Sequence, residues 1–428
     1  MTRPYGFAFL SLLSATAAFA QAATIDISGA SFKPLPIAVP QPVTQDDGAK
    51  KAAPEFDEGM MFDLGACGLF QVLDRKSYLA DAKEGITASA INFSNWANVG
   101  ADLLVKTQLT LDGDTLRGDL RLFSVGAQKE DLKVSDSAPA KESRKLAHKL
   151  ADALYKHFTK ETGPFLTHLA WVKKNGTGKD VFISDWDGKN PATVASGGIN
   201  LLPTLAPDGS VAFTSYRKGK PDLWVGRPGG EARVLVAQGR MATGIAYSPD
   251  GKRIAYSLAD GESSQIWIAA ADGSSAKQIT NTPYFINTSP SWSPDGKRLA
   301  FVSNRGGTPQ IYLMGADGSD VKRITFQGNY NQTPDWSPRG DLIAFTARDE
   351  RNAFDLFTIE VATGKVNRLT QDQGNNEEPS FSPNGRLIVF SSTRTGGTPA
   401  LFVMTFDGNN QVALPAGGGS FSTPAWGK

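Results

Sequence analysis

Short apolar runs alternate with polar turns through the last two thirds of this chain. The runs RLAFVS at Arg298–Ser303 and QIYLM at Gln310–Met314 are mostly apolar and include β-branched and aromatic residues, and Gly, Asp or Asn residues separate such runs. The same pairing of runs returns at Arg253–Ser257 and Gln265–Ala269. This pattern predicts consecutive antiparallel strands joined by tight turns.

A five-residue phrase precedes most of these paired runs. Its copies LAPDG, YSPDG, WSPDG, WSPRG and FSPNG begin at Leu205, Tyr247, Trp292, Trp336 and Phe381. Successive copies start 42, 45, 44 and 45 residues apart, a period typical of stacked β-propeller blades. Pro, Asp and Gly at these positions suit a type I turn followed by a left-handed residue, so the phrase is a predicted hairpin tip. We interpret its aromatic residue as packing between blades.

A second small turn counts the blades. It follows the second run of each unit, at Asp187-Gly188, Gly229-Gly230, Asp272-Gly273, Asp317-Gly318, Thr363-Gly364 and Asp407-Gly408. Six such turns predict six blades. The first unit, near Phe165, lacks the phrase, whereas Trp426 stands in register 45 residues beyond Phe381. We therefore predict that the C-terminal strand completes the first blade and leaves no exposed sheet edge.

The residues before the repeats predict a small α/β domain. Its expected elements are strands at Pro34–Pro40 and Phe70–Asp74, a helix around Phe56–Cys67, a hairpin that turns at Asp112-Gly113-Asp114, and an amphipathic helix at Glu142–Thr159. Gly163-Pro164 marks the break before the first blade. The predicted fold is therefore mainly β, a six-bladed β-propeller preceded by a small α/β domain.

The N-terminus resembles a secretory signal peptide. Arg3 precedes an apolar stretch from Phe7 to Phe19, and small residues allow cleavage after Ala20 or Ala22. The stretch Thr24–Lys33 then reads either as an edge strand or as a loose tail able to join a partner's sheet. The predicted division is residues 1–22 as signal peptide, 23–33 as a flexible segment, 34–162 as the α/β domain and 163–428 as the propeller.

Composition narrows the classes of function. The 428 residues carry a net charge of +1 without clustered Lys and Arg, which argues against nucleic-acid binding. No later stretch approaches the ~20 apolar residues of a membrane span, so we expect an exported protein without membrane insertion. Cys67 is the single cysteine, which excludes an intramolecular disulfide. We expect it to be buried and inert in a helix at Gly59–Phe70.

Catalytic and metal-binding patterns give no positive signal. His148 and His157 are nine residues apart on one predicted helix and so face opposite ways; we interpret them as surface or helix-edge residues, which predicts no metal site between them. The chain lacks the G-x-S-x-G nucleophile elbow of propeller-capped serine peptidases. The Asp-Gly pairs are explained by the hairpin turns alone. We expect no catalytic residue, no cofactor and no enzyme activity.

The predicted propeller offers a docking face instead. A polar loop precedes each of several phrases, and innermost strands converge on the central channel, so these loops are expected at one mouth. The candidate binding residues are Met241, Thr243, Asn287, Thr288, Asn331, Gln332, Thr333, Asn376, Glu377 and Glu378.

Taken together, these motifs resemble one family. A signal peptide, an Ile-containing mature N-terminus, GLFQVLD at Gly68–Asp74, GADLLV at Gly100–Val105 and six blades ending in PAW are similar to the TolB family of the Tol–Pal system. The resemblance covers essentially the whole mature chain. The blade phrase alone occurs in many propellers, but its combination with this N-terminal domain is specific.

The resemblance implies a periplasmic binding protein. Members of this family bind the lipoprotein Pal at the channel mouth and TolA through the extreme N-terminus, in a system that supports outer-membrane integrity and envelope constriction at cell division; some bacteriocins exploit it, and other outer-membrane proteins are further candidate partners. The ten candidate residues above would form the Pal face. The TolA segment would include Thr24, Ile25, Asp26, Ile27 and Ser28.

Three positions depart from the family pattern. Ile245 stands where the other repeats have Pro, Met241 where a His is frequent, and Lys106 where a small residue is usual in a central strand. The first two put individual partner contacts in question, and the third a packing detail. The competing hypotheses are a propeller that binds a small ligand or acts as an unrecognised hydrolase, and a purely structural scaffold.

Overall fold

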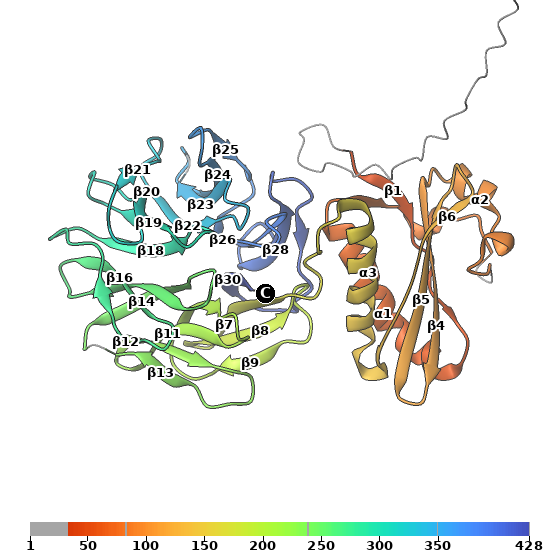
Figure 1. Ribbon diagram of the computed structural model, residues 1–428, viewed down its shortest axis with the longest axis horizontal. Helices are drawn as coiled ribbons and strands as arrows, with labels where there is room; N and C mark the ends of the chain where they lie inside the picture. Colours follow the sequence, from red (N-terminus) through yellow and green to blue (C-terminus); the bar gives the residue numbers. More distant parts are fainter. Residues whose placement is uncertain (1–32, 82–83, 238, 349, 428) are drawn as a thin grey trace, which may run out of the picture.

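The computed structural model describes residues 33–81, 84–237, 239–348 and 350–427, and places a β-propeller beside a smaller α/β domain (Figure 1). The first 32 residues, which include the predicted signal peptide and TolA segment, lie outside the described residues. Within the described ranges, no helix has both the length and the apolar character needed to cross a membrane.

The smaller domain is built on one mixed sheet with strand order β3-β1-β4-β5-β6, in which β2 also pairs with β4. β1 runs parallel to β3 and β4, whereas β4, β5 and β6 are antiparallel. The predicted hairpin is confirmed, with its turn at Gly113 in the left-handed region. The strands are β1 (Leu35–Ala38), β2 (Val43–Thr44), β3 (Phe70–Val72), β4 (Leu103–Asp112), β5 (Thr115–Ser124) and β6 (Lys129–Pro139).

Helices α1 (Asp47–Ala66) and α3 (Ser143–Thr159) cover one face of this sheet. Helix α1 begins well before the expected Phe56, because the Asp46 side chain caps it by accepting a hydrogen bond from the Ala49 amide. Packing against α3 then carries the helix through Pro54. The short helix α2 (Phe93–Asn98) packs on the opposite face.

Single 3-10 turns complete this domain, at η1 (Arg75–Ser77), η2 (Ala88–Ala90) and η3 (Ala140–Glu142). Lys106, expected to disturb the packing of β4, is buried and ion-paired to Glu84 at 3.0 Å, with its ammonium 5.6 Å from the Trp96 ring centre. A buried cation with a carboxylate partner is tolerated where an unpaired one is not. The departure from the family pattern therefore comes with a local partner.

The propeller has six four-stranded antiparallel sheets, as the repeats predict. In each blade the first strand lies at the channel and the fourth at the rim. The first three blades, from the channel outward, are β30 (Phe421–Gly427), β7 (His168–Asn175), β8 (Gly178–Asp185), β9 (Ala192–Ala195); β10 (Asn200–Leu205), β11 (Val211–Lys218), β12 (Lys220–Gly226), β13 (Arg233–Val236); and β14 (Met241–Tyr247), β15 (Arg253–Ala259), β16 (Ser264–Ala270), β17 (Lys277–Gln278).

The fourth to sixth blades repeat this plan. Their strands are β18 (Asn287–Trp292), β19 (Arg298–Ser303), β20 (Gln310–Gly315), β21 (Lys322–Arg323); β22 (Asn331–Trp336), β23 (Leu342–Arg348), β24 (Phe354–Glu360), β25 (Val366–Arg368); and β26 (Asn376–Phe381), β27 (Leu387–Ser392), β28 (Ala400–Thr405), β29 (Val412–Ala413).

The ring closes as predicted. The C-terminal strand β30 pairs antiparallel with β7, with Ser422 opposite Val172 and Ala425 opposite Ala170. The first blade thus contains strands from both ends of the propeller sequence. This closure pairs strand edges that would otherwise be exposed.

Apolar clusters between neighbouring blades hold the ring together, and the aromatic residues of the phrases belong to them. Trp292, Trp336 and Phe381 are buried, which confirms the packing interpretation for these three. The Arg253 guanidinium stacks 4.6 Å above the Trp292 ring. Each such residue fills the space between its own blade and the preceding or following one.

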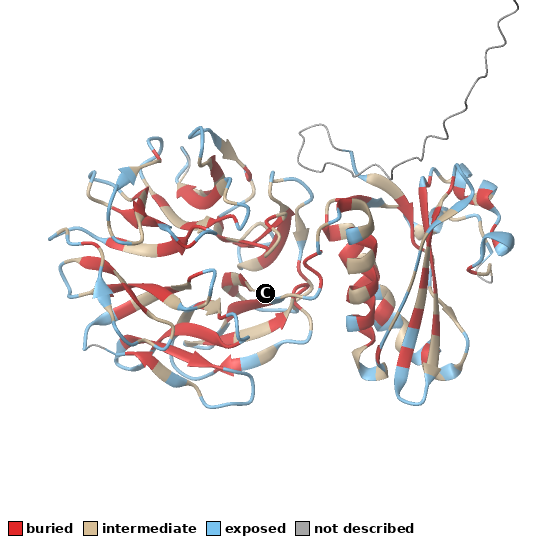
Figure 2. Cartoon of the chain, viewed as in Figure 1, coloured by how far each residue is buried: buried red, intermediate tan, exposed pale blue. Residues whose placement is uncertain are grey.

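The core of the smaller domain continues into the propeller. One cluster of buried residues joins Leu146 and Leu150 of α3 to Trp186 and Trp426 of the first blade and to Leu401 of the sixth. Helices α1 and α3 lie between the sheet and the propeller, and buried positions follow α3 on both sides (Figures 1 and 2). The α/β domain is therefore packed firmly on one side of the ring.

Candidate functional site

The two ends of the propeller channel differ in what covers them. The phrase turns form one end, where Glu161 at the end of α3 contacts Arg339 and Arg386, and Asn384 donates to the Thr162 carbonyl. We call this end the domain-facing mouth. The innermost strands begin at the other end, which we call the open mouth.

A ring of left-handed residues lines the channel between these mouths. In every innermost strand one residue has a positive φ at a bulge: Leu202 (50°), Gly244 (60°), Ser289 (53°), Thr333 (49°), Glu378 (61°) and Thr423 (48°). Non-glycine residues in this region are strained by roughly 1–3 kcal/mol each, and such strain is common at functional sites.

The third blade achieves the same bulge differently. Five of the ring positions precede a proline, whereas Gly244 precedes Ile245. Glycine reaches the left-handed region without a Cβ penalty, so the missing proline does not change the backbone path here. The departure at Ile245 therefore leaves the channel geometry intact.

Seven of the ten predicted docking residues present side chains at the open mouth or in the part of the channel next to it. Met241 is 38% exposed and the other six are partly buried, and all lie within innermost strands rather than in the loops expected from the sequence. These seven are Met241, Thr243, Thr288, Gln332, Thr333, Glu377 and Glu378.

The three predicted asparagines are instead buried structural residues. Asn287, Asn331 and Asn376 expose 0%, 1% and 0% of their surface. The Asn287 amide donates to Gln265 Oε1 at 3.1 Å and its oxygen accepts from Arg305 at 2.7 Å. The other two make the equivalent bond, to Gln310 Oε1 and Asp355 Oδ1 respectively. Their expected place on the surface is corrected: these side chains join adjacent blades.

Three carboxylates lie along the channel in surroundings that disfavour their charge. Burial raises the pKa of Glu378 to about 7, and the carboxylate accepts a hydrogen bond from the Thr423 amide. Burial also raises the pKa of Glu377. At the far end, burial raises the pKa of Asp335 to about 6, although the Phe381 amide and the Ser291 hydroxyl donate to it.

Exposed apolar side chains gather at the open mouth, a feature the sequence analysis missed. Tyr284 and Phe326 are 79% and 73% exposed, respectively. Large apolar side chains exposed on loops or strand ends at this mouth are Ile199, Leu202, Tyr216, Met241, Tyr284, Phe285, Ile286 and Phe326. The run TPYFIN at Thr282–Asn287 carried the available signal, because three large apolar residues there follow a proline outside any strand. Such a concentration around a polar channel is typical of a protein-docking surface.

A groove continues this apolar surface. A cavity of about 680 Å³ lies between the fourth and fifth blades beside Phe326, and its lining includes Arg348, Glu350 and Asn352. The Arg348 guanidinium stacks against the rings of Tyr330 and Phe354 at 4.9 and 5.1 Å. The open mouth therefore combines a polar channel rim, the eight exposed apolar side chains named above, which we call the apolar knobs, and one adjoining groove.

The domain-facing mouth holds a cavity of about 450 Å³. Its lining includes the phrase prolines, Trp292, Trp336 and Trp426. Asp335 is the charged residue of this lining, and its carboxylate already accepts two hydrogen bonds. A ligand there would meet apolar rings beside several hydroxyl groups, but no set of converging acidic groups in this lining.

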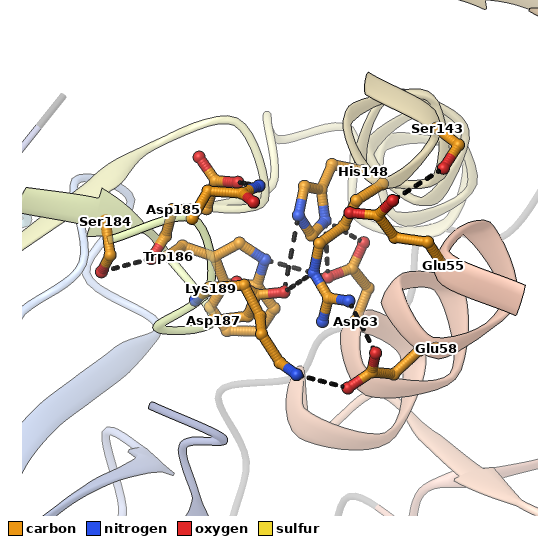
Figure 3. Close-up of polar contacts among 12 residues, drawn as sticks. Glu55, Glu58, Asp63, Ser143, His148, Ser184, Asp185, Trp186, Asp187 and Lys189 are labelled. Atoms are coloured by element: carbon orange, nitrogen blue, oxygen red, sulfur yellow. Dashed lines mark hydrogen bonds and ion pairs between the residues drawn. The ribbon is translucent and has the colours of Figure 1, made fainter. Parts of the chain in front are cut away.

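The interface between the domains contains a buried polar cluster, drawn in Figure 3. His148 on α3 is 2% exposed, and its Nδ1 lies 2.8 Å from Asp63 Oδ2 on α1. Trp186 of the first blade donates to the same carboxylate at 2.9 Å. Arg144 donates through Nε to Asp187 Oδ2 at 2.6 Å. The interpretation of His148 as a surface residue is wrong, because α3 is covered by the propeller as well as by the sheet.

The remaining residues singled out in the sequence have simpler surroundings. His157 is partly exposed and His168 is exposed. Cys67 follows the last residue of α1 and is buried as predicted, and burial raises the pKa of its thiol to about 12. A thiol with so high a pKa is a poor nucleophile at neutral pH.

Fold and site together define a two-domain, six-bladed β-propeller protein in which the smaller domain contacts one end of the ring on one side and the opposite mouth is open. The family model for the TolB beta propeller domain matches residues 155–428, and that for the TolB amino-terminal domain matches residues 23–130. The chain therefore belongs to the TolB family.

Relatives and solved structures agree with this assignment. The Tol-Pal system protein TolB of Myxococcus xanthus strain DK1622 is 65% identical over 97% of both chains. The protein of the same name from Anaeromyxobacter dehalogenans strain 2CP-1 is 44% identical over 94% of this chain and 93% of its own. The crystal structure of TolB from Acinetobacter baumannii has a TM-score of 0.79 at 28% identity and covers 92% of this chain and 97% of that one.

Proposed function

We propose that this chain is a periplasmic, non-enzymatic binding component of a Tol–Pal system, and that it docks Pal on the open mouth of its propeller. The single observation that carries the proposal is the concentration of exposed apolar side chains around this mouth, among them Tyr284 and Phe326. Isolated exposed apolar residues need no explanation, but a group of them around one opening favours a protein partner.

The proposed Pal face consists of the seven exposed channel-side residues named above together with the apolar knobs. Polar side chains such as Thr288 and Gln332 would give specificity, whereas Phe326 and Tyr284 would supply most of the buried apolar area. The ring of left-handed residues in the same strands supports the proposal, because backbone strain of this kind is concentrated at binding and switch sites.

We further propose that residues 23–33 form a separate segment that engages TolA, with Thr24–Ser28 as its contact residues. In this scheme residues 1–22 are a signal peptide, residues 34–162 form the domain next to the tail, and residues 163–428 form the Pal-binding unit. The system would then support outer-membrane integrity and envelope constriction at cell division. No nucleic acid, cofactor or membrane insertion takes part in the proposal.

The proposal is tested by mixing the purified mature chain with the soluble domain of Pal from the same organism and measuring complex formation by analytical ultracentrifugation. We expect a one-to-one complex. Failure of the folded chain to form any complex would contradict Pal docking. A parallel titration with the TolA periplasmic domain, with and without residues 24–28, tests the tail separately.

The channel cavity gives little support to the small-ligand alternative. Its acidic member, Asp335, is held by the Phe381 amide and the Ser291 hydroxyl rather than being free for a ligand. The hydrolase and scaffold alternatives lack a specific observation in their favour. The Pal measurement separates docking from the scaffold alternative, since a scaffold would form no tight complex.

A further inference from the structure

The buried cluster between the domains contains a histidine nitrogen that has no hydrogen-bond partner among the described residues. His148 Nδ1 is held by Asp63, whereas Nε2 has no hydrogen-bond partner and lies 3.6 Å from Asp187 Oδ2. The imidazole stands between these two carboxylates in Figure 3. Buried polar atoms are nearly always paired, so an orphaned imidazole nitrogen beside a carboxylate indicates a missing partner.

Carboxylates from the propeller converge on the same point. One ligand atom each from His148, Asp185 and Asp187 lies within 4.8 Å of the other two. Asp185 ends β8 and Asp187 stands in the turn that follows, while His148 comes from α3 of the other domain. Imidazole nitrogen and carboxylate oxygen are a ligand set that Zn²⁺ accepts, with water in the remaining position.

The second layer of contacts suits a metal ligand. Asp63 lies against His148 Nδ1 and accepts from Trp186 Nε1, which fixes the ring with Nε2 facing Asp187; in the tautomer protonated at Nδ1, Nε2 is free to bind a metal. A carboxylate behind a ligating histidine is the usual arrangement in zinc proteins. The Lys189 amide and Arg144 hold the two oxygens of Asp187 in place.

Charge and access agree with a divalent ion. With a neutral imidazole, the four charges of Asp63, Asp185, Asp187 and Glu58 would balance those of Arg144, Lys189 and one divalent cation; Glu58 lies 2.8 Å from Lys189 and 3.2 Å from Arg144. A cavity of about 490 Å³ is lined by His148, His168, Asp185 and Asn190, and would admit the ion and its water.

We propose that His148, Asp185 and Asp187 form a binding site for a divalent transition metal of the Zn²⁺ type, built across the interface between the α/β domain and the first blade. The ion joins α3 to the β8–β9 turn and so restrains how the two domains move against each other. This inference is independent of Pal docking.

The test uses the full mature chain without an affinity tag, freed of metal by a chelator and titrated with Zn²⁺ at about pH 8, where histidine ligands are deprotonated. Co²⁺ in a parallel titration gives visible absorption bands that report coordination by protein ligands. We expect one ion per chain. His148→Gln and Asp185→Asn should each weaken binding at least about tenfold, and Asp63→Asn, which alters only the second layer, by about 10- to 100-fold.

His157→Gln is the matched control, because His157 lies on the same helix but outside this cavity, and it should bind as the wild type does. Circular dichroism checks the fold of each variant. Should His148→Gln fail to fold, the partly exposed Asp185 gives the decisive variant. Absence of binding by the wild type, or binding unchanged in Asp185→Asn, would overturn the proposal and leave a protonated imidazole between the two carboxylates.

Discussion

The two mouths of the propeller are built from the same repeat, yet they have opposite surroundings. At the domain-facing mouth Arg386 and Asn384 of the sixth blade donate to Glu161 and to the Thr162 carbonyl, and Trp186 of the first blade belongs to the core shared with the smaller domain. At the open mouth the described residues leave Tyr284 and Phe326 largely exposed. At the domain-facing end the first, fifth and sixth blades thus contact the smaller domain, and we propose that the opposite end of the ring binds a partner.

The comparison teaches that repeated sequence does not imply equivalent function at the two ends. Turn phrases must form a regular hairpin, so their residues are constrained by the fold. Loops at the open mouth carry fewer such constraints and can vary toward binding. Variants that act on one end should therefore leave the other end largely unchanged.

The largest expected change in stability comes from removing the Trp186 side chain, which packs between the two domains at the domain-facing end. This side chain is fully buried against Phe62, Phe165 and Trp426, and it donates to Asp63. Trp186→Ala should lower the free energy of unfolding by about 3–5 kcal/mol, because it leaves a cavity and removes a hydrogen-bond donor from the buried Asp63 carboxylate. Urea denaturation followed by circular dichroism measures this. A loss below about 1 kcal/mol would mean that the interface contributes little.

A second expected effect is the pH dependence of stability caused by Glu378, which lies in the channel next to the open mouth. Burial raises the pKa of Glu378 from its ordinary 4.5 to about 7, so the folded state holds this proton more tightly than the unfolded state. The stability that this tighter proton binding contributes to the folded state is fully present below pH 4.5 and is lost as pH rises through 7. Glu378→Gln removes this titration. The unfolding free energy of the variant minus that of the wild type should therefore be about 2 kcal/mol higher at pH 8 than at pH 5. Equal effects of the variant at both pH values would contradict this account.

The pKa of Glu161, at the domain-facing end, is shifted in the opposite direction to that of Glu378, so its effect on stability has the opposite pH dependence. Hydrogen bonds from Arg386 lower the pKa of Glu161 below its ordinary 4.5, so its contribution is present above 4.5 and is lost as pH falls through the folded value. Glu161→Gln should cost about 1 kcal/mol at pH 7, a small figure because the pair is partly solvated. Unfolding curves of variant and wild type should converge in acid; curves that stay equally far apart would exclude an ionic contribution.

The smallest effect on stability should accompany a change at the open mouth. Phe326→Ser removes an exposed ring, so the free energy of unfolding should change by less than about 0.5 kcal/mol, while Pal affinity should fall about tenfold. Val321, also exposed but on the β20–β21 turn at the other end, provides the matched control. Calorimetric titration with Pal compares Phe326→Ser with the control Val321→Ser. Equal affinities of the two variants for Pal would argue against a special role for the open mouth.

Much of the fold could be predicted from the sequence because the repeat carries redundant signals. Turn phrases, apolar runs and second turns all indicate the same blade, and the position of Trp426 predicts the closing strand. Strand β6 was missed, because its residues from Lys129 to Pro139 are mostly charged or small and only Ala138 is buried. Pairing with β5 rather than an apolar face defines that strand.

The candidate site was less predictable, since it depends on contacts between distant segments. Periodicity cannot tell that a second surface covers α3, so His148 was assigned to the outside. Nor can it tell that Asn287 bonds to Gln265 of the preceding blade rather than facing a partner. Polar residues at strand starts serve blade packing and docking alike, and only the three-dimensional arrangement separates the two roles.

The central claim is that the open mouth, and not the domain-facing mouth, receives the partner. The most direct test is calorimetric titration of the soluble domain of Pal into wild type, Thr288→Arg and Ser274→Arg. Thr288 lies in the channel-side strand β18, whereas Ser274 is exposed on the β16–β17 turn at the opposite end. We predict that binding is lost in Thr288→Arg and retained in Ser274→Arg. Undiminished binding by Thr288→Arg would contradict the account.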